Sequence, residues 1–95
     1  MPTAQDYDAV PYEDCPLVQT NPDNLSVIAS LFGVPAAAPH QCRVLELGCA
    51  SGGNIIPLAY HWPESTYIGI ELSEKQAELG NTLINELELT NISID

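Results

Sequence analysis

The apolar and polar positions divide the chain into a non-periodic beginning and a patterned remainder. Residues 1–20 contain three prolines and show neither a helical nor a strand period, so we expect an extended arm. A helix is expected next, because Asn21 can cap it and Pro22 suits its first position. Gly33 then ends this helix. Its apolar residues repeat at helical spacing and are Leu25, Ile28, Ala29 and Phe32.

A strand, a glycine-rich loop, a helix and a second strand are expected after an alanine- and proline-rich connector. Residues 42–47 form a short, mostly apolar run of the kind found in parallel sheets, and residues 48–53 form the loop. Residues 54–60 are apolar enough for a helix packed on a sheet. Residues 66–71 are rich in β-branched and aromatic side chains, which favours a strand.

The C-terminal part continues the alternation of helix and strand. Ser73 and Gln76 form a capping box for a further helix, and residues 91–95 begin a third strand. One face of that helix carries Ala77, Gly80, Ile84 and Leu87. The fold class is therefore α/β, a partial Rossmann-like doubly wound sheet with the first βαβ unit and the start of strand three, preceded by an extended arm and a helix.

The composition of the chain limits the classes of protein to which it can belong. Of the 95 residues, 45% are hydrophobic and 16% charged, which indicates one soluble globular unit with a modest core. A formal net charge of −11 argues against a nucleic-acid partner. Three cysteines without ligand spacing indicate neither a disulfide framework nor a metal site. No apolar run reaches the roughly 18 residues of a membrane span, and the N-terminus lacks signal-peptide features. We therefore expect a cytoplasmic protein without membrane contact.

The loop and the acid after the second strand have the arrangement of a nucleoside-cofactor site. Gly48 and Gly52 suit a turn in which the backbone bends sharply and a ligand approaches without a Cβ in the way. Glu71 lies 19 residues after Gly52, near the spacing at which a carboxylate accepts hydrogen bonds from ribose hydroxyls. Both features fall at the carboxyl ends of parallel strands, where doubly wound folds bind their ligands.

The loop spacing and a neighbouring acid distinguish two cofactor classes. A dinucleotide-binding loop reads G-x-G-x-x-G, whereas this loop has Ala50 between the glycines at 48 and 52. Glu46 would repel a pyrophosphate at short range but favours a ligand that carries sulfonium and ammonium groups. The charge pattern therefore favours S-adenosylmethionine, and a dinucleotide-binding oxidoreductase fragment is the less favoured alternative.

Two segments resemble motifs of the class I S-adenosylmethionine-dependent methyltransferases. Residues 44–52 resemble motif I, and residues 67–73 resemble the acidic motif on strand two. The resemblance implies that the first acid and the glycines line the methionine end of the cofactor. The second acid would hold the ribose, and the residue after it would lie near the adenine. The candidate cofactor-binding residues are Glu46, Gly48, Cys49, Ala50, Gly52, Asn54, Glu71, Leu72 and Gln76.

For three of these candidates the sequence gives a more specific expectation. Ala50 stands where the family commonly has glycine, which is tolerable for cofactor binding. Cys49 is expected chiefly to pack, and Gln76 chiefly to cap a helix. Tyr12 is a further candidate, either covering the cofactor or packing the arm against the core.

The beginning of the chain resembles bacterial methyltransferases that carry a C-terminal regulatory domain. The resemblance rests on residues 7–12, 19–23 and 31–33. Some members of that group modify protein lysines, so a protein is one option for the unidentified methyl acceptor. The resemblance implies that residues 21–95 form the N-terminal part of a truncated methyltransferase domain.

The sequence names no catalytic residue. In-line methyl transfer demands alignment and desolvation more than an acid or base, and His40 and His61 lack a carboxylate or second ligand at useful spacing. The chain alone is expected to be catalytically incomplete, with an unpaired apolar edge on its first strand. A non-enzymatic fragment that acts as an interaction module is therefore the other alternative.

Overall fold

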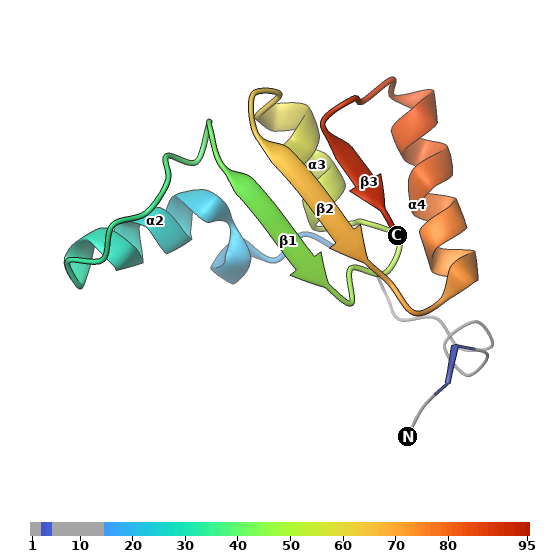
Figure 1. Cartoon of the computed structure of the whole chain (residues 1–95), viewed down its shortest axis with the longest axis horizontal. Helices are drawn as coiled ribbons and strands as arrows, with labels where there is room; N and C mark the ends of the chain where they lie inside the picture. Colours follow the sequence, from blue (N-terminus) through green and yellow to red (C-terminus); the bar gives the residue numbers. More distant parts are fainter. Residues whose placement is uncertain (1–2, 5–14) are drawn as a thin grey trace.

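The structure, a computed structural model, describes residues 3–4 and 15–95 and contains a parallel sheet (Figure 1). Its strands are β1 (Arg43–Leu47), β2 (Thr66–Ile70) and β3 (Ile92–Ile94). They lie in the order β1-β2-β3, and both neighbouring pairs are parallel. Since parallel neighbours require crossover connections, this topology confirms the βαβ unit and third strand predicted from the sequence.

Residues 15–95 contain the 3-10 turn η1 (Val18–Thr20) and the helices α2 (Pro22–Leu31), α3 (Ile55–His61) and α4 (Glu74–Glu86). Two of these segments, α2 and α4, begin at the predicted caps. Oδ1 of Asn21 accepts a hydrogen bond from the Asp23 N–H at 2.9 Å, and Oγ of Ser73 accepts one from the Gln76 N–H at 3.2 Å. None of these helices combines the length and apolarity that a membrane span requires.

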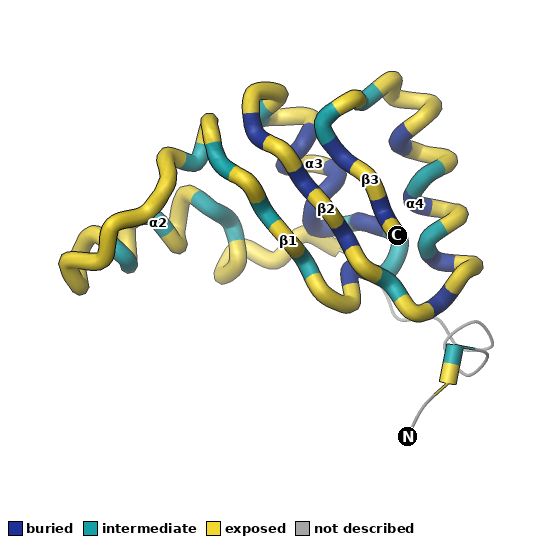
Figure 2. Tube along the Cα trace, viewed as in Figure 1, coloured by how far each residue is buried: buried dark blue, intermediate teal, exposed yellow. Residues whose placement is uncertain are grey.

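The two faces of the sheet differ in what covers them. Tyr67 and Ile94 point toward α3 and α4 and are 0% and 4% exposed. Leu45 and Leu47 point the opposite way and are 63% and 74% exposed. Figure 2 shows this alternation as dark and yellow segments along β2. Within the described residues, therefore, helices pack against one face, which we call the closed face, and the other is the open face.

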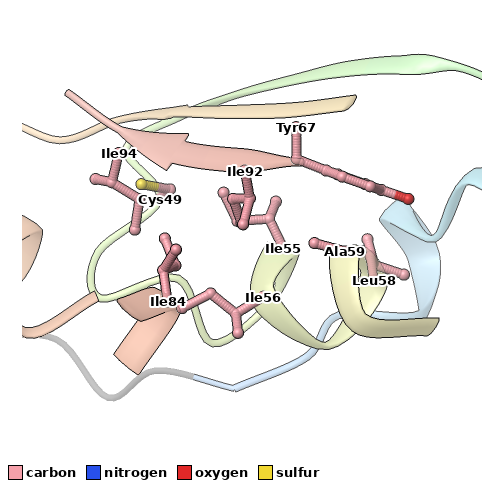
Figure 3. Close-up of a cluster of buried hydrophobic side chains, with 9 residues drawn as sticks. All are labelled: Cys49, Ile55, Ile56, Leu58, Ala59, Tyr67, Ile84, Ile92 and Ile94. Atoms are coloured by element: carbon pink, nitrogen blue, oxygen red, sulfur yellow. The ribbon is translucent and has the colours of Figure 1, made fainter. Parts of the chain in front are cut away.

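The core lies between the closed face and the two helices that cover it (Figure 3). It consists of Cys49, Ile55, Ile56, Leu58, Ala59, Tyr67, Ile84, Ile92 and Ile94. Gly80 lets α4 approach the loop after β1 closely, because a Cβ there would lie 2.7 Å from the backbone oxygen of Ser51. The core therefore joins that loop to both helices and holds it in place.

Four expectations from the sequence differ from the structure or lie outside it. Val18–Thr20 form one 3-10 turn instead of extended backbone, and Tyr12 lies outside the described residues. The apolar stripe of α2 packs little within the described residues, since this helix contains no buried residue and Phe32 at its end is 80% exposed. Leu87, which the helical pattern places on a buried face, is 42% exposed because it lies just beyond the end of α4.

Candidate functional site

The loop between β1 and α3 contains three residues with positive φ. The angle is 69° at Gly48, 53° at Ala50 and 86° at Gly52, in the left-handed region that glycine adopts without strain. A Cβ on Gly52 would lie 2.7 Å from Cδ1 of Ile56, whereas a Cβ on Gly48 would meet nothing within 4 Å. Packing therefore requires Gly52, while Gly48 leaves an open approach to the backbone. The conformation of Ala50 explains why glycine is favoured at that position.

Glu71 fastens this loop to the turn after β2. Its Oε1 accepts a hydrogen bond from the Ala50 N–H at 2.8 Å, and its Oε2 accepts one from the Ser73 N–H at 2.8 Å. Each carboxylate oxygen has a second lone pair, so these bonds leave acceptor capacity for the hydroxyl groups of a ligand. The glycine loop and Glu71 thus lie together at the carboxyl edge of the sheet.

Glu46 lies near the end of β1, on the closed face. Its Oε2 accepts a hydrogen bond from Nδ2 of Asn54 at 3.1 Å. The same Nδ2 donates to Oγ1 of Thr20 at 3.1 Å, and Oδ1 of Asn54 accepts a hydrogen bond from the Leu17 N–H at 2.8 Å. The surroundings of Glu46 therefore include residues 17–20 of the arm. The sequence analysis did not predict that Leu17 and Thr20 contact Asn54 beside Glu46. The only sequence feature that pointed to such a contact is the polar side chain of Thr20, next to the Asn21 cap.

The remaining candidates take different positions. Cys49 is 2% exposed, and its Sγ lies in the core (Figure 3), 2.5 Å from where a Cβ on Gly69 would be. Gln76 is 6% exposed in the first turn of α4, whereas Leu72 is 57% exposed in the turn before that helix. The position of Cys49 fits the packing role expected of it. The Gln76 backbone N–H donates to Ser73 Oγ, but the Ser73 N–H donates to Glu71 Oε2, so a capping role of the Gln76 side chain stays a prediction. Contact of the three residues with a cofactor stays a prediction.

Charge at this edge of the sheet is negative. Glu46 and Glu71 both lie there, and the chain has only two basic residues in its sequence. Arg43 begins β1 and so lies at the amino end of the strand, whereas Lys75 lies in the first turn of α4, where the neighbouring Glu74 offsets its charge. A negative edge favours a ligand with positive charge and hydroxyl donors over one with a pyrophosphate. The residues present therefore fit the sulfonium, ammonium and ribose groups of S-adenosylmethionine.

A parallel βαβ unit with a glycine loop and an acid at the end of each of its strands is typical of α/β proteins that bind a nucleoside cofactor. Comparison with known families makes this class more specific. The family model described as "Putative methyltransferase" matches residues 40–95, more than half of the chain. The chain therefore belongs to this methyltransferase family.

Individual relatives extend the match toward the N-terminus. The chain is 45% identical over 86 residues to the uncharacterized protein RP789 of Rickettsia prowazekii (strain Madrid E), covering 90% of this chain and 16% of that protein. The structure of PKMT2 from Rickettsia typhi in complex with AdoHcy matches with a TM-score of 0.81 and 32% identity, covering 88% of this chain and 16% of that one. A tRNA (guanine-N(7)-)-methyltransferase of Zea mays is 41% identical over 46 residues, covering 48% of this chain and 18% of that protein.

These comparisons confirm the methyltransferase resemblance and the partial Rossmann-like fold predicted from the sequence. They favour this class over the dinucleotide-binding oxidoreductase alternative. The chain spans 16% of the length of both RP789 and PKMT2. The expectation that nucleic acid is not a partner stays a prediction, because a tRNA methyltransferase is among the relatives.

Proposed function

We propose that this chain binds S-adenosylmethionine and contributes the cofactor site of a methyltransferase. In this arrangement Glu71 accepts hydrogen bonds from the ribose hydroxyls, and Gly48 lets the cofactor approach the loop backbone. Glu46 attracts the positively charged methionine end. Leu72, exposed beside Glu71, offers an apolar contact to the adenine.

One observation carries this proposal, the hydrogen bond of 2.8 Å between Oε1 of Glu71 and the Ala50 N–H. It brings an acid from the end of β2 onto a glycine loop that follows β1, although the two residues are 21 positions apart. A ribose bound to this carboxylate therefore lies beside a loop that a ligand can approach closely. The structural relative PKMT2 was solved in complex with AdoHcy, which supports the same cofactor here.

The chemistry that follows is an in-line displacement. S-adenosylmethionine, when bound, would supply an activated methyl group to a nucleophile of the acceptor, with S-adenosylhomocysteine as the leaving group. Such a reaction is accelerated chiefly by alignment of the two partners. The part of this chain is to orient the cofactor, with Glu71 and the loop holding the nucleoside and Glu46 holding the charged amino-acid end.

The acceptor proposed is a protein. A net charge of −11 repels a polyanion and attracts a basic protein segment. The tRNA methyltransferase of Zea mays matches 48% of this chain, which makes tRNA the competing acceptor. Because the chain alone is expected to be catalytically incomplete, its acceptor preference is measured as binding of the chain to a lysine-rich protein and to tRNA. Binding to the protein is expected, whereas binding to tRNA alone would contradict this choice.

Isothermal titration calorimetry with S-adenosylhomocysteine tests the cofactor site. Glu71→Ala is expected to weaken binding by at least about tenfold, because hydrogen bonds to a charged group are lost. Glu46→Gln removes one charge without changing the shape of the side chain and should also weaken binding. Glu78→Gln is the matched control, since it neutralises an exposed carboxylate on α4.

Controls show whether a variant loses affinity at the site or because its fold is damaged. Gly52 is unsuitable for substitution, because a Cβ there would clash with Ile56 in the core. Circular dichroism should show the same secondary structure in each variant as in the unaltered chain, and a nicotinamide dinucleotide should release no heat. A folded chain that binds no S-adenosylhomocysteine, or a Glu71→Ala variant that binds it unchanged, would disprove the proposed site.

A further inference from the structure

Asn54 joins three segments that are distant in the sequence. It directly precedes α3 and is 8% exposed. Its Oδ1 accepts the N–H of Leu17 at 2.8 Å, and its Nδ2 donates to Thr20 Oγ1 and to Glu46 Oε2, both at 3.1 Å. A single side chain therefore contacts the arm, the end of β1 and the start of α3.

The partners of Asn54 determine how its amide is oriented. A backbone N–H can only donate, so the oxygen of the amide must face Leu17. The nitrogen then faces Glu46 and Thr20, and two acceptors match the two hydrogens of an amide nitrogen. The nitrogen therefore has no remaining hydrogen to donate to a cofactor.

Helix capping does not account for this side chain. Asn54 occupies the position before the first residue of α3, yet its side chain makes no capping hydrogen bond there, and its φ and ψ are −90° and −46°. Both Asn21 and Ser73, by contrast, cap their helices through a side-chain oxygen. The polar group of Asn54 is thus directed entirely toward the arm and Glu46.

We propose that Asn54 is a positioning residue that couples the arm at residues 17–20 to the carboxylate of Glu46. This inference rests on the proposed function and assigns Asn54 an indirect role in place of cofactor contact. A glutamate side chain has several rotamers, and a hydrogen bond from the amide selects among them. Docking of the arm on Asn54 fixes the amide, and the amide fixes the carboxylate that receives the methionine end.

The arm is in turn anchored to α2. Nδ2 of Asn24 donates to the backbone oxygen of Val18 at 2.7 Å, which holds η1 against this helix. The Thr20 hydroxyl also donates to the backbone oxygen of Leu17 at 3.1 Å. The two arm groups that meet Asn54 therefore belong to one hydrogen-bonded turn, so displacement of η1 removes both contacts together.

Two ligands separate this role from a merely structural one. S-adenosylhomocysteine carries the amino-acid group that Glu46 is proposed to hold, whereas methylthioadenosine lacks it and keeps the nucleoside. Asn54→Ala is expected to weaken binding of S-adenosylhomocysteine by about tenfold or more and to leave binding of methylthioadenosine unchanged. Both affinities are measured by calorimetry on the full chain.

Asn91→Ala is the matched control. Nδ2 of Asn91 donates to the backbone oxygens of Ala59, Trp62 and Ser65, which lie at the other end of α3 and in the turn before β2. This variant removes a structural asparagine of the same kind without touching the arm or Glu46. It should leave the ratio of the two affinities unchanged, whatever it does to stability.

A second variant keeps the inference testable if Asn54→Ala does not fold. Thr20→Val removes only the arm hydroxyl and is expected to weaken S-adenosylhomocysteine binding several-fold, but to have no effect in a Glu46→Gln background. Equal losses for both ligands, or equal effects of Thr20→Val in both backgrounds, would overturn the inference. If the unaltered chain binds neither ligand, the proposed function itself fails.

Discussion

The closed and open faces of the sheet are built from similar residues but have opposite surroundings. On the closed face Ile92 and Ile94 are 8% and 4% exposed, whereas on the open face Leu47 and Ile68 are 74% and 41% exposed. Strands that are apolar on both sides are typical of parallel sheets covered on both faces. An apolar side chain in these strands therefore stabilises the fold only where the helices bury it. In the described chain, stabilisation by burial comes from one face.

The largest expected effect is a truncation on the closed side compared with a truncation on the open face. Ile55 is 1% exposed and lies in the core, so Ile55→Ala should lower the free energy of unfolding by about 3 kcal/mol, through lost burial and a cavity. Leu47→Ala should change it by about 0.5 kcal/mol or less, because that side chain is mostly in water already. Urea denaturation followed by circular dichroism measures both values.

Similar losses for the two variants would contradict the comparison. They would mean that the open face is buried in solution, which analytical ultracentrifugation of the unaltered chain can detect as association. Unequal losses in the expected order would place the stability of the chain on the closed face.

Adding a methyl group to each face tests the same difference, because the packed closed face has no room for it and the exposed open face does. A Cβ on Gly69 would lie 2.5 Å from Sγ of Cys49 and 2.8 Å from Cδ1 of Ile55, so Gly69→Ala should destabilise the fold by about 2 kcal/mol. Ser93→Thr adds a methyl group on the exposed side of β3 and should be nearly neutral. Thermal unfolding compares the two variants, and a neutral Gly69→Ala would show that the closed face has room to relax.

Much of the fold could be predicted because the relevant signals are local. The caps at Asn21 and Ser73 and the short apolar runs of the strands each depend on a few consecutive residues. The glycine loop and Glu71 could be placed at one edge because parallel strands end together. These inferences needed no knowledge of which segments pack against each other.

The remaining features depend on contacts between distant segments. Asn54 lies 34 and 37 positions from its partners Thr20 and Leu17, and no local pattern encodes such pairs. The sequence also could not distinguish the closed face of the sheet from the open one, because both carry apolar residues. The exposure of the α2 stripe was unpredictable for the same reason, since helical periodicity shows which side is apolar but not what covers it.

Ala50 offers a smaller test, in the loop that connects the strand to the packed helix. Its φ of 53° is costly for a residue with a Cβ, so Ala50→Gly should raise the free energy of unfolding by about 1 kcal/mol, part of which the greater freedom of the unfolded chain offsets. The hydrogen bond from its N–H to Glu71 involves only the backbone and should persist. Chemical denaturation measures the gain. A loss of stability would indicate that the Ala50 methyl group makes contacts worth more than the strain.

The smallest expected effect concerns the hydroxyl of Tyr67, the one buried side-chain polar atom without a hydrogen bond in the described residues. Burial raises the pKa of Tyr67, an effect that the Ser65 hydroxyl partly opposes although its contact falls short of hydrogen-bond geometry. Tyr67→Phe removes an unsatisfied group at little cost in packing and should stabilise the fold by about 0.5 kcal/mol at neutral pH.

The free energy of unfolding should depend on pH differently in the unaltered chain and in Tyr67→Phe. Because the pKa of Tyr67 is higher in the folded state, the unfolded chain ionises first as the pH rises past about 10. The contribution of the neutral tyrosine to stability is complete below that pH and is lost above it. The free energy of unfolding should therefore fall more steeply between about pH 9.5 and 11 in the unaltered chain than in Tyr67→Phe. Since the other titrating groups are common to both proteins, parallel curves would mean that the Tyr67 hydroxyl reaches water, and that the closed face is less tightly packed at the Ser65 end of β2 than the burial of Tyr67 indicates.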